Sequence, residues 1–245
     1  MAVTPDARRV LVDNVETTRL VVVDVASAKV QRPINLIVDI RPGGFGRIAV
    51  TPDGARAYVT NQPKQYLAVV DMAAGNAIES TLDMRPSDVV LSRDGRTLYV
   101  AGCKEFCTTG TVQLIDTASL TLLRSFAVGG SPYRFALSPD GTRAYTTNLA
   151  GPSLSIVDVA AGTTLATLPI GVEPTGLAVS PDGTRAYVVS QAERRMTIVD
   201  TTQNVVAGNV GLPSEPREVV VAPDGRRLWV STRDAILVLD AARLQ

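Results

Sequence analysis

The chain repeats one pair of short phrases six times, and this repetition limits its possible folds more than any other feature. The first phrase centres on an aspartate, usually followed by glycine and then by an arginine and an aromatic residue. Its copies read TPDARRVLV from Thr4, TPDGARAYV from Thr51, SRDGRTLYV from Ser92, SPDGTRAYT from Ser138, SPDGTRAYV from Ser180 and APDGRRLWV from Ala222. They begin 47, 41, 46, 42 and 42 residues apart. A period near 40 residues indicates an array of like structural units.

The second phrase is an apolar run that ends in aspartate, and it follows each copy of the first. Its copies are RLVVVDVA to Ala26, LAVVDMA to Ala73, VQLIDTA to Ala118, LSIVDVA to Ala160, MTIVDTT to Thr202 and ILVLDAA to Ala242. Two phrases in a fixed order six times define one repeat, and no stretch shows sustained helical periodicity with caps.

Each repeat is predicted to form four short strands, a to d. In the fifth repeat they are expected at Thr175 to Ser180, Arg185 to Ser190, Met196 to Asp200 and Asn204 to Val210. These segments are β-branched and bounded by turn residues. Between strands a and b, proline presets φ, aspartate bonds nearby backbone and glycine accepts positive φ.

Four-stranded repeats of this length stack radially and close into a propeller. The sequence therefore predicts a single all-β domain over 1–245, a β-propeller of about six blades. The expected blades are 1–45, 46–86, 87–132, 133–174, 175–216 and 217–245. Only five residues follow Asp240, so the last blade is predicted to lack its outer strand, or the chain is a trimmed part of a longer propeller.

Two sets of repeated residues are interpreted as structural. The first occupies one position of strand b and is expected to pack between blades: Leu11, Tyr58, Tyr99, Tyr145, Tyr187 and Trp229. The second ends strand c and is expected to cap the c–d turn through side-chain to backbone hydrogen bonds: Asp24, Asp71, Asp116, Asp158, Asp200 and Asp240. A ligand site seldom recurs in every blade, so neither set is assigned to chemistry.

Three segments resemble the YVTN family of bacterial and archaeal propeller repeats. They are AYVTN at Ala57 to Asn61, the V-D-V-A-A-G turn at Val157 to Gly162, and I-G-V-E-P-T-G-L-A-V-S-P-D-G at Ile170 to Gly183. The resemblance covers essentially the whole chain. It implies a propeller of the surface-layer, secreted or periplasmic kind, and related propellers include lactonases and lyases. Fold analogy does not choose among these activities.

Composition excludes several functions. The chain has 24 Lys and Arg against 24 Asp and Glu, so its zero net charge argues against a nucleic-acid footprint. It has no histidine, which removes Ser/His/Asp and Cys/His nucleophile systems and histidine metal sites. No cofactor or metal is expected. No run of about 18 apolar residues predicts a membrane span, and the N-terminal residues lack a signal-peptide pattern.

The two cysteines, Cys103 and Cys107, enclose a short stretch of an enlarged loop in the third repeat. A zinc site needs about four ligands, which this chain does not supply there. A local disulfide is the leading interpretation, with free thiols as the alternative. A disulfide would place the protein in the periplasm or outside the cell, if a leader was removed; otherwise a cytoplasmic location is expected. The protein is expected to be a monomer.

The irregular loops indicate a functional face. Loops b–c and d–a of a propeller lie on one face, around the channel. Tyr99 and Asp116 are 17 positions apart, against 13 in four other repeats, and Asp24 and Asp53 are 29 apart, against 23 or 24 elsewhere. Four non-repeated aromatics are expected in such loops: Phe45, Tyr66, Phe106 and Tyr133. Phe126 and Phe135 are expected in the core.

One position just before strand a is predicted to point toward the channel mouth and varies between blades: Arg47, Asp88, Arg134, Gly176 and Glu218. Its charged neighbours are Arg85, Glu173, Glu215 and Arg217. Arginine forks there are expected to hold a carboxylate or phosphate, with Phe45 and Tyr133 covering an apolar part. Candidate catalytic residues are Asp88, Glu173 and Glu218 as general bases, and Tyr133. The alternative is a ring of mutually paired charges around an empty channel.

Three functions are consistent with these patterns. The first is a non-catalytic module that binds a small molecule or a protein at this face. The second is a metal-independent propeller enzyme, of the lyase, isomerase, cyclase or lactone hydrolase type, that acts on a small, possibly anionic molecule. The third is a structural unit of a surface layer.

Overall fold

The computed structural model describes residues 1–14, 19–31, 33–36, 46–104 and 106–244. These residues form antiparallel β-strands throughout, arranged in six small sheets, with one 3-10 turn near the C-terminus. The predicted all-β class is therefore confirmed. The chain divides into two compact units, Met1–Glu105 with Val112–Ser125, and Phe106–Thr111 with Phe126–Gln245.

The first unit contains two complete sheets and most of a third, with strands in sequential order. The first sheet holds β1 (Ala2–Val3), β2 (Arg9–Asn14), β3 (Arg19–Asp24), β4 (Lys29–Val30) and β5 (Ile34–Asn35). The second holds β6 (Ile48–Val50), β7 (Arg56–Asn61), β8 (Tyr66–Asp71) and β9 (Asn76–Thr81). The third holds β10 (Arg85–Leu91), β11 (Thr97–Cys103), β12 (Gly110–Asp116) and β13 (Leu122–Val128).

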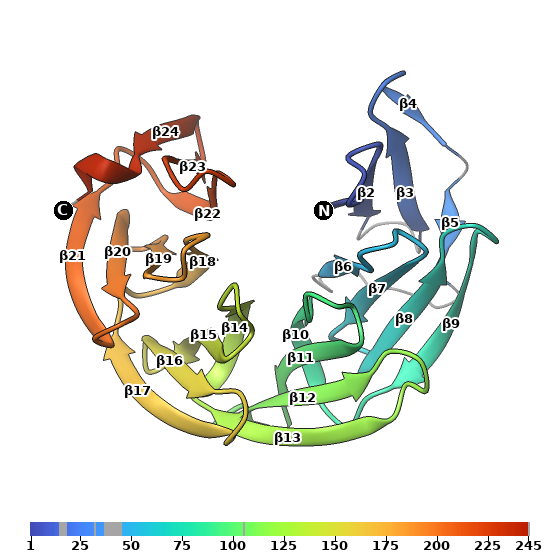
Figure 1. Cartoon of the computed structure of the whole chain (residues 1–245), viewed down its shortest axis with the longest axis horizontal. Helices are drawn as coiled ribbons and strands as arrows, with labels where there is room; N and C mark the ends of the chain where they lie inside the picture. Colours follow the sequence, from blue (N-terminus) through green and yellow to red (C-terminus); the bar gives the residue numbers. More distant parts are fainter. Residues whose placement is uncertain (15–18, 32, 37–45, 105, 245) are drawn as a thin grey trace. The chain divides into compact units, whose positions relative to one another are not determined.

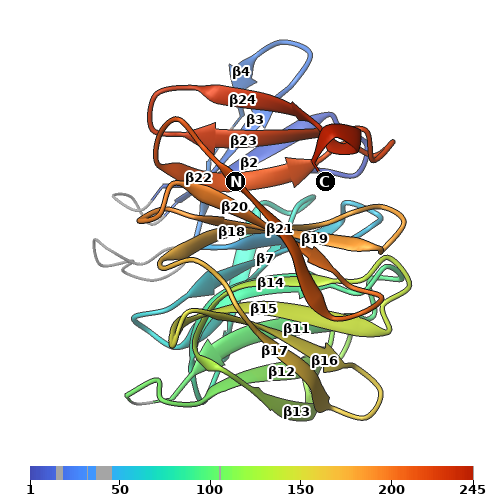
Figure 2. The ribbon, with the colours of Figure 1, turned by 90° about the vertical axis from the view of Figure 1, so that its left-hand side faces the viewer.

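The second unit contains three further sheets, which Figure 2 shows one above the other. The fourth sheet holds β14 (Gly130–Leu137), β15 (Arg143–Ala150), β16 (Ser153–Asp158) and β17 (Thr163–Pro169). The fifth holds β18 (Pro174–Val179), β19 (Arg185–Ser190), β20 (Arg195–Asp200) and β21 (Val205–Gly211). The sixth holds β22 (Pro216–Val221), β23 (Arg227–Thr232) and β24 (Ile236–Asp240), followed by η1 (Ala241–Arg243).

Two sheets depart from four strands. The sixth has three, as predicted, because the chain turns into η1 after β24. The first has five, because its outermost strand is divided into β4 and β5, and both pair with β3. Pro33 lies between these two short strands and has no N–H to donate to the ladder.

Within the second unit, β14, β18 and β22 lie along one side and β17 and β21 along the other (Figure 1).

The a–b turn is held by one polar arrangement in five of the six repeats. In the fifth, the Ser180 hydroxyl donates to Asp182 Oδ1 at 2.6 Å and accepts from the Arg185 N–H at 2.9 Å. The same carboxylate oxygen accepts from the Thr184 N–H at 3.0 Å. The sixth repeat has Ala222 in the place of Ser180, so its turn has no such hydroxyl.

The predicted role of the strand c aspartates is confirmed in the five repeats that have a c–d turn, and in the sixth Asp240 caps η1 instead. Asp71 Oδ1, for example, accepts from the N–H groups of Ala73 and Ala74 at 2.9 and 2.8 Å. The other five carboxylates accept equivalent backbone bonds within three residues. These aspartates are turn caps, and their repetition reflects the repeated turn.

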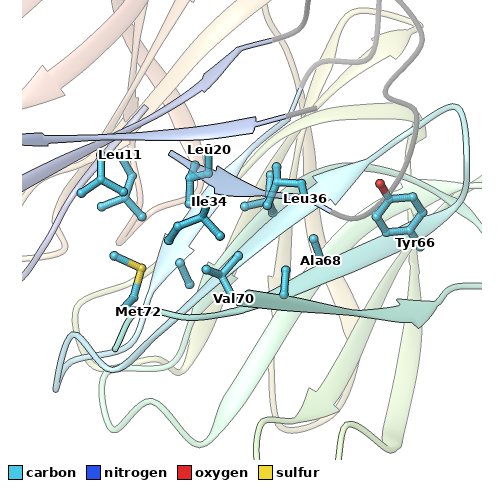
Figure 3. Packing of buried hydrophobic residues seen from close by; sticks show 12 residues of the cluster. Leu11, Leu20, Ile34, Leu36, Tyr66, Ala68, Val70 and Met72 are labelled. Carbon is cyan, nitrogen blue, oxygen red and sulfur yellow. The ribbon is translucent and has the colours of Figure 1, made fainter. Parts of the chain in front are cut away.

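Sheets within a unit stack by burying opposite faces against each other. In the first unit, Leu11 and Leu20 of the first sheet pack on Ala68 and Val70 of the second (Figure 3). In the second unit, Tyr187 and Ile198 of the fifth sheet pack on Leu228 and Val230 of the sixth. In both contacts, one partner is the residue at the strand b position that recurs in every repeat. Five of the six residues at this position are at most 7% exposed.

Trp229 is the sixth member, and for it the expectation of packing between blades stays a prediction. Its side chain is 38% exposed. Trp229 lies in the last sheet of the second unit, and within this unit no further sheet follows to cover its face. The two strand phenylalanines, Phe126 and Phe135, are buried as predicted.

The turn aspartates generate a prediction about acid stability. Hydroxyl and backbone N–H donors lower the pKa of Asp140 and of Asp182 below its usual value, chiefly through Ser138 and Ser180. Because the unfolded pKa is about 3.9, their contribution to stability is complete above that pH and is lost as pH falls through the lower folded value.

We therefore expect the free energy of unfolding of the wild type to fall below about pH 4. In Asp140→Asn/Asp182→Asn, which keeps an acceptor at both turns, this decrease should be shallower. Urea denaturation at several pH values measures it. An unchanged pH dependence in the double variant would contradict the assignment.

Candidate functional site

The variable position of the predicted site lies directly after a β-bulge that recurs in four repeats. The strand a register shifts between Pro86 and Asp88, between Pro132 and Arg134, and in the same way in the fifth and sixth sheets. A bulge adds one residue to a strand and re-aims the side chains beside it. The recurrent Pro-x before this position is the sequence signal for it, because proline within a sheet is confined to edge strands and bulges.

The structure corrects the expected placement of this position. The aligned residues were expected just before strand a, and Tyr133 in a d–a loop. Asp88, Arg134 and Glu218 instead lie inside β10, β14 and β22, and Tyr133 is the bulged residue of β14. Tyr66 was also expected in a loop, but it begins β8, is buried, and its hydroxyl accepts from Asn61 Nδ2 at 2.9 Å.

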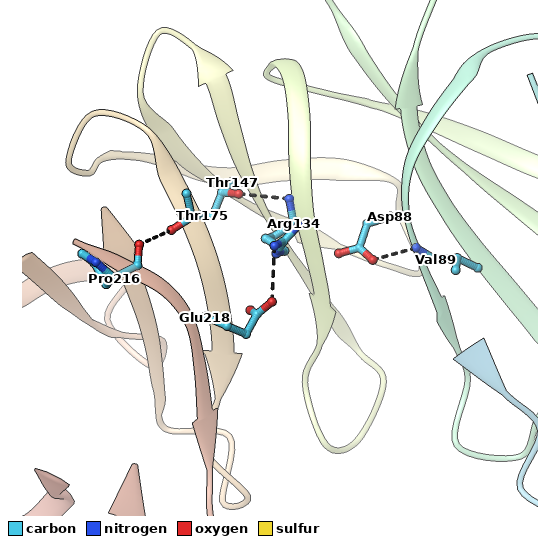
Figure 4. Close-up of polar contacts among 7 residues, drawn as sticks. All are labelled: Asp88, Val89, Arg134, Thr147, Thr175, Pro216 and Glu218. Atoms are coloured by element: carbon cyan, nitrogen blue, oxygen red, sulfur yellow. Dashed lines mark hydrogen bonds and ion pairs between the residues drawn. The ribbon is translucent and has the colours of Figure 1, made fainter. Parts of the chain in front are cut away.

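Arg134 and Glu218 form an ion pair that joins the fourth and sixth sheets (Figure 4). Arg134 Nη2 donates to Glu218 Oε2 at 3.3 Å, and the two side chains are 10% and 36% exposed. The Tyr133 ring lies against the guanidinium, with its centroid 4.4 Å from the Arg134 Cζ atom, which is a cation–π contact. The Arg134 N–H donates to Thr147 Oγ1 at 3.1 Å and so anchors the strand beneath the side chain.

One donor of Arg134 has no hydrogen-bond partner among the described residues. Its Nε atom is buried and unpaired. A guanidinium carries five N–H donors in a planar fork that matches a carboxylate or phosphate. A buried, unpaired donor on a cation has a substantial free-energy cost. The site therefore contains one fixed positive group with an unused hydrogen-bonding direction.

Gly176 allows the strands at this site to approach closely. It occupies the aligned position in β18, between the sheets that Arg134 and Glu218 come from. A Cβ atom added there would lie 2.9 Å from Glu218 Cα and from Val219 N. The neighbouring Thr175 Oγ1 donates to the Pro216 carbonyl at 3.1 Å and ties β18 to β22 (Figure 4).

The remaining predicted site residues are not brought into this ion pair. In the second unit, Arg217 and Glu173 are exposed, and Glu215 is half-buried outside the strand. In the first unit, Arg85 is exposed at the start of β10. Asp88 is buried and its carboxylate accepts from the Val89 N–H at 2.8 Å (Figure 4).

Two further predicted ligand-binding residues, Arg47 and Phe45, lie on either side of the expected boundary between the first and second blades. The half-buried Arg47 donates its N–H to Thr60 Oγ1 at 2.9 Å. Phe45 lies outside the described residues.

A disulfide joins Cys103 and Cys107. Cys107 has a positive φ of 48°, and its carbonyl accepts from the Ser131 N–H at 2.9 Å. This bond ties the loop to the start of β14, three residues before Arg134. The loop also presents Phe106, which is 92% exposed.

The clefts of the second unit lie on the opposite face, among the Pro-Asp-Gly turns. One of about 1050 Å³ lies beside the turns of the fifth and sixth sheets, and one of about 420 Å³ beside those of the fourth and fifth. Both are lined by residues that the repeat carries in most blades, such as Arg143 and Arg185. They follow from stacking the repeats and do not mark a specific ligand site.

Within the described ranges, no group of three or more Asp, Glu, Cys or His side chains is placed to bind a metal ion. No helix in those ranges is long and apolar enough to cross a membrane.

The six small antiparallel sheets, in which neighbouring strands follow one another in the sequence, form a β-propeller of six blades. One similar solved structure, with a TM-score of 0.82 and 18% identity, is a functionally unknown protein from Desulfotomaculum acetoxidans DSM 771; the match covers 96% of this chain and 77% of that one. Another is Kuenenia stuttgartiensis hydrazine synthase, with a TM-score of 0.64 and 20% identity over 98% of this chain and 94% of that one. Such low identities show a shared fold alone.

No protein-family profile and no curated protein matches the chain. The resemblance to YVTN repeats therefore stays a prediction.

The close approach at Gly176 predicts a packing effect of a single methyl group. We expect Gly176→Ala to lower the free energy of unfolding by about 1–3 kcal/mol, because backbone atoms of β22 must move. Gly208→Ala is the matched control, since nothing lies within 4 Å of a Cβ atom at that position of the same sheet. Chemical denaturation compares the two. Equal stability of both variants would contradict the tight contact.

The disulfide predicts a chemical difference between oxidised and reduced protein. Protein prepared under oxidising conditions and alkylated without reductant should gain no mass, and after reduction it should gain two alkyl groups. Because the closed loop is short, reduction should cost about 2 kcal/mol of stability at most. Two alkylated thiols in the unreduced protein would refute the bond.

Proposed function

We propose that this protein is a non-catalytic binding module that holds a small carboxylate- or phosphate-bearing molecule at Arg134. The unpaired, buried Nε of Arg134 carries this proposal. The Tyr133 ring and the Glu218 carboxylate hold the guanidinium in place, so little side-chain entropy is lost when an anion binds. The location also fits the general rule that function lies in the non-repeated residues of a rigid scaffold.

The catalytic alternative is less well supported. A general base must be within reach of the proton that it removes. Among the predicted bases of the second unit, Glu173 is exposed and Glu218 is engaged by Arg134. Binding needs only the arginine, whereas catalysis needs a further group beside it.

Substitutions that remove the charge of Arg134 or of Glu218 are expected to change the anion affinity in opposite directions. Arg134→Ala removes a charged hydrogen-bond donor worth about 1.5–3 kcal/mol, so binding should weaken about ten-fold to a hundred-fold. Glu218→Gln removes the negative charge that competes for the guanidinium, so binding should strengthen. Arg226→Ala is the control, because Arg226 is exposed in a Pro-Asp-Gly turn on the other face.

The measurement is isothermal titration with succinate, citrate and inorganic phosphate as probes. A trimethylammonium salt at equal ionic strength controls for non-specific salt effects. The proposal fails if no probe anion binds the wild type, or if Arg134→Ala binds the probes as the wild type does.

A further inference from the structure

The disulfide loop between β11 and β12 is held in a backbone conformation that its residues do not adopt readily. Phe106 and Cys107 have consecutive positive φ angles of 64° and 48°. Non-glycine residues keep such a conformation only where the surrounding structure fixes it. The bond from Cys103 to Cys107 closes the loop around these residues and supplies that constraint. The segment Phe106–Thr111 belongs to the second unit, as Arg134 does.

The constrained loop lies directly against the segment that leads into β14. The Cys107 carbonyl accepts from the Ser131 N–H at 2.9 Å, and Ser131 itself has a positive φ of 52°. A Cβ atom added at Gly130 would lie 2.6 Å from the Thr108 carbonyl oxygen. This approach leaves no free space between the loop and the segment, so a change in the loop has to be accommodated by the segment.

A second glycine brings the end of the loop against the same segment. A Cβ atom added at Gly110, the first residue of β12, would lie 2.7 Å from Pro132 Cδ. Pro132 begins the bulge, because the register shifts between it and Arg134 and Tyr133 is the extra residue. The loop therefore contacts the residues that set the direction in which the Arg134 side chain leaves the strand.

This link is specific to the sheet that carries Arg134. The residues equivalent to Ser131 in the fifth and sixth sheets are Glu173 and Glu215. Their carbonyls accept from the N–H groups of Gln191 and Arg233 at 2.9 Å, within their own sheets. Among the described backbone hydrogen bonds, these two positions have no counterpart of the bond from the Ser131 N–H to the loop of the preceding sheet. The two cysteines of the chain enclose that loop.

The disulfide is accessible to a reductant from one side. Cys107 is half-buried, whereas Cys103 is 4% exposed. A thiolate of a dithiol reductant therefore attacks Cys107 Sγ, and the Cys103 thiolate leaves. The second thiol of the reductant then attacks the mixed disulfide, forms the reductant's own disulfide and releases Cys107. Two electrons pass from the dithiol to the protein, and the two released thiolates take up the protons that the dithiol lost.

We propose that this disulfide regulates anion binding at Arg134: the oxidised loop holds Tyr133 and Arg134 in the binding geometry, and reduction by a dithiol weakens binding. After reduction, Phe106 and Cys107 relax from their positive φ angles, which turns the Cys107 carbonyl away from Ser131. The segment before the bulge then loses one of its anchors. This inference rests on the proposed function, because it names how the same site is controlled.

The experiment compares oxidised protein with protein reduced by dithiothreitol, through anion affinity and residue-specific hydrogen exchange. Titration with citrate or inorganic phosphate should give a dissociation constant at least about five-fold higher in the reduced state. Exchange of the Ser131 and Arg134 amide hydrogens should become faster, because their hydrogen bonds depend on the loop. The Arg185 amide, which donates to Ser180 Oγ at 2.9 Å in the fifth sheet, is the internal control and should not change.

Three variants separate the disulfide from other effects of the dithiol. Cys103→Ser/Cys107→Ser should have the affinity of the reduced state with and without dithiothreitol. Gly130→Ala keeps the disulfide but pushes the loop and the segment apart, so it should weaken anion binding in the oxidised protein. Gly208→Ala is the matched control, since nothing lies within 4 Å of a Cβ atom there, and it should keep the redox response. Circular dichroism verifies that each variant folds.

The outcomes distinguish this inference from the proposed function. Equal anion affinity in the two states, or unchanged exchange of the Arg134 amide on reduction, would overturn the regulation and leave anion binding in place. If no probe anion binds in either state, the proposed function fails. Faster exchange at Arg134 would then still support control of this position by the disulfide, and unchanged exchange would overturn both.

Discussion

Each sheet of this protein is apolar on both faces, so its stability depends on contact with a neighbour on either side. The fifth sheet shows this directly: Tyr187 faces the sixth sheet, and Val188 packs toward the fourth. Repeat proteins derive their stability from such nearest-neighbour contacts rather than from one central core.

The polar residues of the repeat serve the turns that make this stacking possible. A hydroxyl at Ser138 or Ser180 satisfies the turn carboxylate and the first N–H of strand b together. Arg143 and its equivalents then reach the next sheet. Because the repeated carboxylates and arginines hold turns and neighbouring sheets in place, we do not assign them to acid–base catalysis. Specific chemistry is left to positions that differ between repeats.

The Arg134 site shows how one such position acquires a function from its neighbours. Its guanidinium is fixed by an aromatic ring on one side and a carboxylate from two sheets away on the other. Glycine at position 176 allows β18 and β22 to come close beneath the pair. A propeller fold by itself is compatible with many activities, so the electrostatic arrangement at this site, and not the fold, supports anion binding.

The sequence alone determined the number of sheets, the strand positions within two residues in the fifth repeat, the turn caps and the short last sheet. These features are local and repeat every 41 to 47 residues, so the pattern states them several times. Only the tertiary structure decided that Arg134 meets Glu218, 84 residues later in the chain, while Arg217 and Glu173 stay exposed. This outcome depends on how sheets stack and on how a bulge re-aims a side chain, and these long-range geometries leave no period in the sequence.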